Sequence, residues 1–397
     1  MPIADVPIRG GWVELERDRI AGVGSGPAAG AVDLGRAVIL PALVNAHTHL
    51  ELSYLRDRVP PSTRFINWIR VLMAARRQWP DVSDPRILGA AREGIDEAMA
   101  SGTGLVGDIS NTLVTVPLLR DAGLAANVFY ELLGFDTPDP QKRVQDARAR
   151  AHDTGPGDDS VRVSLAPHAP YSVSPGLFSA IRADLDAEAA RLSTVHLGES
   201  QDEIEFLKDG SGEWRTLLEE LGVWTDEWTP PGCSPVEYLA DLGFLDSRVV
   251  VVHGVQFSGE DLATLRALGA TVVSCPRSNR YAGVGDPPIE SFYAMGVSVA
   301  FGTDSLASVQ DLNMFSELAQ ARRLAPRVSA RTLLESATLR GACALGFERE
   351  FGSIEAGKRA SLIAVQVPAG VSDVEEYLLT GIEPGAIKWL DPELTHE

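Results

Sequence analysis

The stretch at residues 38–53 reads VILPALVNAHTHLELS, an apolar run that ends on two histidines one residue apart, His47 and His49. Side chains two residues apart on an extended strand point to the same side, so both imidazoles can converge on one point. Two neutral imidazoles at a strand end can hold a metal ion, although an isolated His-x-His pair is more often structural. The positions of the other histidines decide between these interpretations.

Composition and charge restrict the class of partner. The chain has 397 residues, enough for one large domain or two ordinary ones, and a net charge of −20. That charge is opposite to the one expected of a nucleic-acid binder or of a surface that seeks anionic membranes. We therefore expect a small-molecule partner, no nucleic acid and no membrane, and the sequence leaves a homo-oligomer open.

The cysteines and the N-terminal residues predict a cytoplasmic protein. Three cysteines lie far apart without a Cys-x-x-Cys pair, which suits a reducing compartment. The first twenty residues lack the apolar core of a signal peptide, and the most apolar run, near residues 38–44, is too short to span a bilayer.

Short apolar runs alternate with helix-like segments over residues 38–303, which predicts an α/β fold with a parallel sheet. Glycines mark the points where a helix ends and a buried strand begins, as in LRALG-ATVVS and FYAMG-VSVAF. Eight runs are the count of a (β/α)8 TIM-like barrel. A doubly wound open sheet is the alternative, but no glycine-rich phosphate loop follows an early strand. The predicted strands are residues 38–46, 105–110, 125–131, 161–167, 193–197, 248–254, 270–276 and 297–303.

The two ends of the chain differ from its middle. Residues 2–37 and 351–367 read as short strands and turns, and neither piece is large enough to bury a core alone. We therefore expect a small composite β-sandwich domain of residues 1–37 and 346–397 beside a catalytic barrel of residues 38–345.

Most of the seven histidines follow the ends of predicted strands. In a barrel these positions share the carboxyl-end rim, where active sites of this architecture are built. Each residue alone has an ordinary structural explanation, such as a packed histidine or an Asx turn. Their coincidence on one rim indicates a metal site. The rim residues are His47, His49, His168, His196 and His253, together with Asp304 at the end of the eighth strand.

Imidazole nitrogens with one carboxylate suit zinc or iron(II), which activate water. Asp304 can bind such a metal and accept a hydrogen bond from the water. Glu199, three residues after His196, can reach over the metal and pass a proton to a ring nitrogen, as the non-ligand glutamate of zinc deaminases does. Its alternative role is that of an acid at the start of the next helix. No lysine ends the fourth strand, which favours a single metal ion.

Motifs along nearly the whole chain resemble the amidohydrolase superfamily, in its deaminase and chlorohydrolase-like branch. They are NAHTHLELS, APHAPYSVS, VHLGES, VVHG, SCPRSN, GTDSLAS, SATLRGACALG and FGSIEAGKRASLIAV. The resemblance implies one divalent metal ion, zinc with iron as the alternative. The ligands that it implies are His47, His49, His196 and Asp304.

The same resemblance implies roles for three further residues. The residue matching His253 hydrogen-bonds the water or the intermediate, the one matching Glu199 protonates the ring nitrogen, and the one matching His168 contacts the substrate. Together with Asp304, Glu199 and His253 would form the catalytic set.

Within this branch, HTHLELS, APHAPYS and HLGES are most similar to the deaminases of 6-aminodeoxyfutalosine in the alternative menaquinone pathway. This implies a nucleoside substrate that loses its 6-amino group as ammonia. Relatives acting on S-adenosylhomocysteine or methylthioadenosine often place a carboxylate after the first strand, where this chain carries the basic segment RFINWIRVLMAARRQWPD. We expect an anionic extension of the substrate to pair with Arg70, Arg76 or Arg77 there, unless these arginines face solvent. Trp68 either stacks on a ring or anchors its helix.

Three alternatives stay open. Another nucleoside or base deaminase, acting on adenosine, S-adenosylhomocysteine, methylthioadenosine or guanine, would need almost the same rim. So would a hydrolase that removes chlorine or another group from a heteroaromatic ring, although Glu199 favours deamination. A non-catalytic metal-binding barrel would have lost Glu199 or a ligand, and neither is missing.

Overall fold

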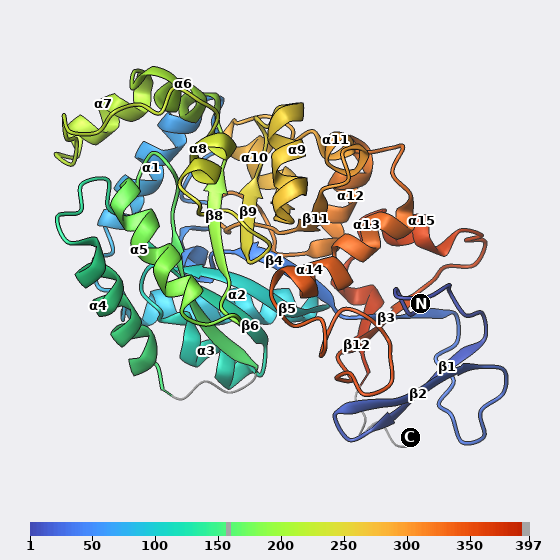
Figure 1. Ribbon diagram of the computed structural model, residues 1–397. Coiled ribbons are helices and arrows are strands. Elements are labelled where there is room, and N and C mark those ends of the chain that lie inside the picture. The colour runs from blue at the N-terminus through green and yellow to red at the C-terminus, as the bar shows by residue number, and fades with distance from the viewer. Residues whose placement is uncertain (156–159, 391–397) are drawn as a thin grey trace.

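A computed structural model describes residues 1–155 and 160–390 of the chain (Figure 1). Eight parallel strands form two sheets of four, each in chain order. The first sheet holds β4 (Leu43–Thr48), β5 (Thr103–Ser110), β6 (Ala125–Leu132) and β7 (Val161–Pro167). The second holds β8 (Ser193–Leu197), β9 (Val249–His253), β10 (Thr271–Ser274) and β11 (Ser298–Phe301).

The two sheets meet at two seams and close a TIM-type barrel. At one seam Thr48 pairs with Asp304 as a parallel bridge, and the Asp304 amide donates to the His47 carbonyl at 3.0 Å. At the other seam the His196 amide donates to the His168 carbonyl at 2.9 Å. The residues that close the barrel are thus among those predicted to form its site.

Helices surround the barrel (Figure 1). The helices before β9 are α1 (Phe65–Arg77), α2 (Pro85–Ala100), α3 (Thr115–Ala122), α4 (Pro140–Asp153), α5 (Pro175–Asp186), α6 (Gln201–Asp209), α7 (Gly212–Glu220) and α8 (Pro235–Asp241). After β9 come α9 (Gly259–Leu268), α10 (Pro276–Ala282), α11 (Ile289–Ala294), α12 (Met314–Leu324), α13 (Ala330–Ser336), α14 (Leu339–Ala344) and α15 (Val374–Leu378). Short 3-10 turns lie at Leu50–Leu55 and Pro384–Ala386. None of the helices described combines the length and the apolar character needed to cross a bilayer.

The predicted strand at residues 38–46 is wrong as a single element. It is divided into β3 (Ala37–Pro41) and β4, with Ala42 between them. β3 pairs antiparallel with β12 (Leu362–Gln366) up to Pro41, and the Ala42 amide still donates to the Ser361 carbonyl at 2.9 Å. The chain then changes partner, and the Leu43 amide donates to the Gly102 carbonyl at 2.8 Å to enter the barrel. The seven other predicted strands are confirmed.

Segments from both ends of the chain lie side by side (Figure 1). A hairpin of β1 (Gly11–Glu16) and β2 (Arg19–Ser25) accompanies a three-stranded sheet in the order β13–β12–β3, where β13 is Ile387–Trp389. Ile20, Ile354 and Leu362 form a small buried cluster of their own. The composite β-sandwich domain and its limits stay a prediction, and residues 391–397 lie outside the described part of the chain.

The seam at His47 generates a stability prediction. A Cβ at Gly302, just after β11, would lie 2.6 Å from the carbonyl oxygen and 2.7 Å from the nitrogen of His47. Backbone atoms cannot yield as a flexible side chain would, so we expect Gly302→Ala to lower the free energy of unfolding by about 1–3 kcal/mol or more. Gly89→Ala in α2 is the matched control because nothing lies within 4 Å of its Cβ. Urea denaturation of both variants tests this, and equal stability would contradict it.

Candidate active site

Three histidines converge on the carboxyl-end rim of the barrel. The His47 ring centroid lies 5.0 Å from those of His49 and His196, and one ligand nitrogen from each of the three falls within 4.8 Å of the others. His47 is fully buried, yet neither of its ring nitrogens has a hydrogen-bond partner. Buried polar atoms are normally partnered, so this orphaned imidazole indicates a metal ligand.

Asp304 completes the donor set. Its Oδ1 lies 3.5 Å from His49 Nε2 and 3.9 Å from His47 Nε2. Its Oδ2 accepts a hydrogen bond from Ser278 Oγ at 2.5 Å, while Oδ1 accepts one from the Ser305 amide at 2.8 Å and faces the histidines. Three imidazoles and one carboxylate are a donor set for zinc or iron(II), and the described residues fit a divalent metal ion.

The backbone at two strand ends is strained. His253 and Asp304 have φ values of 77° and 62°, in the left-handed region that non-glycine residues rarely adopt. Such conformations cost about 1–3 kcal/mol each and cluster at functional sites. Here they aim the two side chains across the rim.

Four histidines of the site lie in surroundings that disfavour their charged form. Burial lowers the pKa of His49 to about 3 and that of His253 to about 3, and it lowers the pKa of His47 and His168 well below the usual range. Neighbouring imidazoles add to this in each case because like charges would repel. Each ring therefore keeps a lone pair available to a cation or a proton.

Glu199 lies at the rim as a buried carboxylic acid. Burial, followed by the nearby carboxylates of Asp304 and Glu203, raises the pKa of Glu199 well above its usual range, which favours its protonated form. Its Oε1 lies 3.6 Å from His253 Nε2. The Glu203 carboxylate fixes this loop by accepting from the amides of Gly198 and Glu199 at 3.1 and 3.0 Å. Glu199 is therefore placed to donate a proton.

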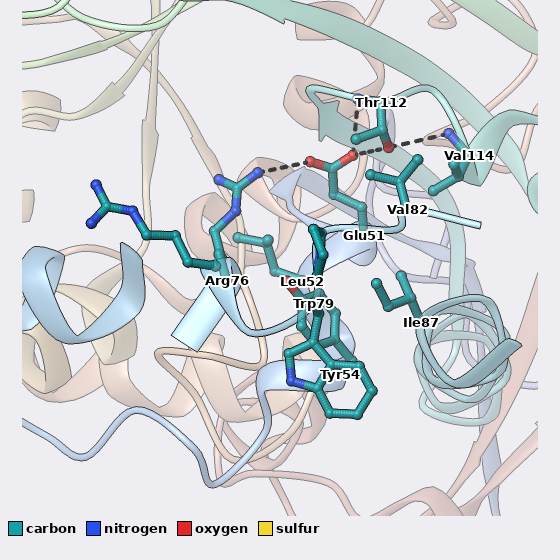
Figure 2. A pocket seen from close by; sticks show the side chains of 11 residues that line it. Glu51, Leu52, Tyr54, Arg76, Trp79, Val82, Ile87, Thr112 and Val114 are labelled. Atoms are coloured by element: carbon teal, nitrogen blue, oxygen red, sulfur yellow. Dashed lines mark hydrogen bonds and ion pairs between the residues drawn. The ribbon is translucent and has the colours of Figure 1, made fainter. Parts of the chain in front are cut away.

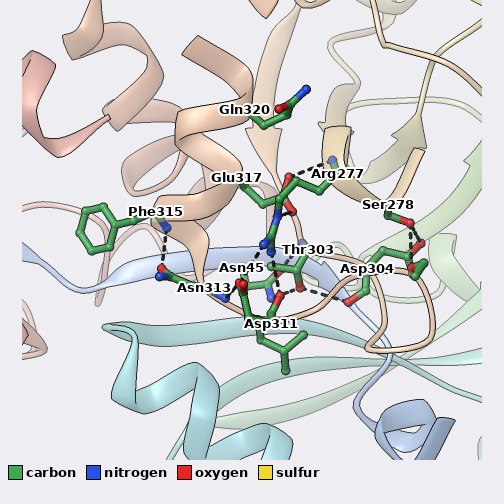
Figure 3. A network of polar contacts seen from close by, with 12 residues as sticks. Asn45, Arg277, Ser278, Thr303, Asp304, Asp311, Asn313, Phe315, Glu317 and Gln320 are labelled. Carbon is green, nitrogen blue, oxygen red and sulfur yellow. Dashed lines mark hydrogen bonds and ion pairs between the residues drawn. The ribbon is translucent and has the colours of Figure 1, made fainter. Parts of the chain in front are cut away.

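Helix α10 holds two of these groups through consecutive residues of SCPRSN (Figure 3). Ser278 donates to Asp304, and Asn279 Oδ1 lies 2.8 Å from His253 Nδ1, which turns Nε2 of that ring toward Glu199. Arg277 anchors the helix through a buried pair with Glu317, Nε to Oε1 at 2.5 Å. The sequence contains this motif, but its hydrogen bonds to Asp304 and His253 could not be predicted from it.

His168 and Glu131 lie beside His196. The His168 and His196 ring centroids are 5.0 Å apart, and His168 Nδ1 lies 2.6 Å from Ser172 Oγ. Glu131, at the end of β6, is buried, and its Oε1 lies 3.4 Å from His196 Nδ1. Sequence reasoning missed Glu131, although it is the only charged residue in its predicted strand.

The three arginines of α1 have different environments. Arg70 pairs with Glu213 and Glu220, and so binds helix α7 instead of facing the site. Arg76 and Arg77 line a cavity of about 370 Å³, and Arg76 Nη2 lies 3.7 Å from Glu51 Oε1 (Figure 2).

Aromatic and apolar side chains complete the cavity, among them Tyr54, Trp79 and Ile87. Trp68 is not among the lining residues; it is buried and stacks on Phe65 with ring centroids 6.1 Å apart, so it anchors its helix.

Comparison with known proteins agrees with this geometry. The model of the amidohydrolase family matches residues 38–382. An aminodeoxyfutalosine deaminase of Deinococcus radiodurans is 34% identical over 334 residues, 79% of this chain and 75% of the relative. A 5-methylthioadenosine/S-adenosylhomocysteine deaminase of Moorella thermoacetica is 30% identical over 99% of this chain and 94% of its own length. The crystal structure of a Xanthomonas campestris adenosine deaminase with bound zinc superposes with a TM-score of 0.82 at 27% identity, covering 98% of this chain and 88% of the other.

The hydrogen bond from Ser278 to Asp304 generates a prediction about metal retention. Ser278→Ala frees the carboxylate to rotate, so we expect metal affinity to fall about tenfold or more. Metal content after dialysis against a chelator, and the rise in melting temperature on adding zinc, would measure this. Ser291→Ala is the control because Ser291 is exposed and makes no side-chain hydrogen bond among the described residues. Equal metal retention in the two variants would show that Asp304 needs no support from Ser278.

Proposed function

The chain belongs to the amidohydrolase family of metal-dependent hydrolases, and we propose that it deaminates a 6-aminopurine nucleoside, with 6-aminodeoxyfutalosine as its substrate. The observation that carries this proposal is Glu199, a buried carboxyl group 3.6 Å from His253 Nε2 whose protonated form is favoured, at the rim where three imidazoles converge. Expelling ammonia from an aromatic ring requires protonation of a ring nitrogen, and this acid can supply that proton.

A divalent metal ion, which we propose to be zinc, would be held by His47, His49, His196 and Asp304 and would activate water for attack. The residues of the chain then manage the protons. Ser278 Oγ donates to Oδ2 of Asp304, so Oδ1, which accepts from the Ser305 amide and faces the histidines, would accept a proton of the attacking water.

Glu199 donates to N1 of the purine as the C–O bond forms at C6. His253, turned by Asn279, presents Nε2 to the same centre. The proton collected by Asp304 passes to the amino group, the C–N bond breaks, and ammonia leaves. The remaining proton of the attacking water, on the C6 oxygen, returns to Glu199 and gives the 6-oxo product.

Two observations support 6-aminodeoxyfutalosine as the substrate, and with it a role in menaquinone biosynthesis. One is the similarity to the Deinococcus radiodurans enzyme. The other is the cavity with Arg76 and Arg77, which would accept an anionic extension of a nucleoside. Arg77 makes no ion pair among the described residues, so its charge is available to a ligand.

Methylthioadenosine or S-adenosylhomocysteine is the second candidate substrate. It is favoured by the Moorella thermoacetica relative, which aligns with nearly the whole chain. Uncharged methylthioadenosine would gain nothing from the arginines of the cavity, whereas the carboxylate of S-adenosylhomocysteine would. A substrate comparison therefore separates these candidates.

We also propose that the ends of the chain form the composite β-sandwich domain of residues 1–37 and 346–397. The antiparallel pairing of β3 with β12 and the cluster around Ile20 support it. Residues 38–41 would then join this domain instead of the barrel, because they belong to β3.

Side-by-side turnover of 6-aminodeoxyfutalosine, methylthioadenosine, S-adenosylhomocysteine and adenosine tests the proposed function. We expect ammonia release and a shift in purine absorbance with all active substrates, and the highest kcat/KM with 6-aminodeoxyfutalosine. Glu199→Gln keeps the shape of the side chain but cannot donate the proton, so its rate should fall about a hundredfold or more. No turnover of any of the four by metal-loaded protein would exclude purine deamination and favour a ring hydrolase.

Arg77 should act on binding of the anionic extension. We expect Arg77→Ala to raise KM for 6-aminodeoxyfutalosine about two- to fivefold at unchanged kcat, because a partly exposed ion pair is worth up to about 1 kcal/mol. KM for adenosine should not change. Arg143→Ala removes one exposed arginine of α4 and is the charge control. An equal rise in KM for both nucleosides would contradict the role of the cavity.

A further inference from the structure

Glu131 has an unusual position for a carboxylate. It ends β6, is 6% exposed, and lies beside the metal-binding histidines. One oxygen, Oε2, accepts a hydrogen bond from Asn111 Nδ2 at 2.8 Å. The other, Oε1, has no hydrogen bond among the described residues, and its closest ion-pair atom is His196 Nδ1 at 3.4 Å. Burying a charged acceptor that is only partly satisfied costs free energy, so its retention needs a reason.

Orienting His196 is an insufficient reason. His196 Nδ1 lies 3.1 Å from the carbonyl oxygen of His168, within hydrogen-bond range, and that bond already fixes the ring. The 3.4 Å separation from Glu131 Oε1 exceeds the usual N–H···O range of about 2.7–3.2 Å. The carboxylate therefore has acceptor capacity that the protein does not use.

Glu131 also lies between the metal centre and the cavity. A chain of polar contacts joins His196 to Glu131, Glu131 to Asn111, and Asn111 Oδ1 to Arg76 Nη2 at 3.1 Å. Arg76 lines the cavity. A nucleoside whose C6 lies at the metal centre and whose extension enters the cavity places its sugar along this path.

We propose that Glu131 accepts hydrogen bonds from the ribose hydroxyls of the substrate and thereby determines specificity for ribonucleosides. An ionised carboxylate only accepts hydrogen bonds, and the vicinal hydroxyls of ribose offer two donors. A site built around such a group rejects an analogue that lacks the hydroxyl, because the buried carboxylate is then left unpaired. This assignment rests on the proposed function.

Turnover of adenosine, 2′-deoxyadenosine and 3′-deoxyadenosine by the metal-loaded wild-type protein and by Glu131→Gln tests the assignment. The kcat/KM of wild type should be about tenfold or more higher for adenosine, because each deoxynucleoside lacks a hydroxyl that donates a hydrogen bond to the carboxylate. Glu131→Gln should raise KM for adenosine more than for the two deoxynucleosides. The three values of kcat/KM should therefore approach one another. Metal content and melting temperature should stay at wild-type values. Glu348→Gln, an exposed glutamate, is the control and should keep the wild-type preference.

Three results would overturn the assignment. An equal loss on all three nucleosides together with reduced metal content would make Glu131 a positioning residue for His196. Two metal ions per chain in wild type and one in Glu131→Gln would make Glu131 a ligand, since His168, His196 and Glu131 have ligand atoms within 4.8 Å. If wild type turned over neither these three nucleosides nor 6-aminodeoxyfutalosine, the proposed function and this assignment would both be wrong, whereas the first two results leave deamination standing.

Discussion

The hydrogen bonds across the two seams of the barrel are also bonds between residues of the site. The Asp304 amide binds the His47 carbonyl at one seam, and the His196 amide binds the His168 carbonyl at the other. The backbone segments that carry these four side chains therefore cannot shift without opening the barrel. Because metal ligands must be held within a few tenths of an ångström, a site built on the bonds that close the fold obtains its preorganisation from the core. The space for that arrangement depends on Gly302, whose missing side chain lets the two strands approach.

Burial then gives the same kind of group different properties. Four carboxylates lie near the centre, and the partner of each decides what it can do. Burial and two nearby acids raise the pKa of Glu199 and favour its protonated form. Glu203, with a pKa raised by burial to about 7, accepts two backbone amides and fixes the loop. Asp304 has one oxygen held by Ser278, and its other oxygen accepts the Ser305 amide and faces the imidazoles. Glu131 has one oxygen held by Asn111, and its other oxygen has no hydrogen bond among the described residues.

The barrel and its rim histidines could be predicted from the sequence because both depend on order along the chain. The alternation of apolar and helix-like segments predicts the number of strands, and the ends of those strands predict which residues lie on the rim. Contacts across the sheet could not be predicted in this way. Glu131 reaches His196 across the intervening strand β7, and the choice between Arg70 and Arg77 depends on the rotation of α1. The predicted strand at residues 38–46 failed at Ala42, because the Ala42 amide donates to Ser361 and the Leu43 amide donates to Gly102, and neither long-range partner can be predicted from the local sequence.

The two halves of the barrel divide the proposed work unequally. The half from β8 to β11 carries the groups that move protons: Glu199 after β8, His253 at the end of β9 and Asp304 after β11. The half from β4 to β7 carries the groups proposed to recognise the sugar and its extension, Glu131, Arg76 and Arg77. The proposed metal ligands come from both halves and would join them. Substitutions in the loops after β4, β5 and β6 can therefore change which nucleoside is accepted without touching the acid or the base. Relatives named for several nucleosides can, on this argument, share one chemistry.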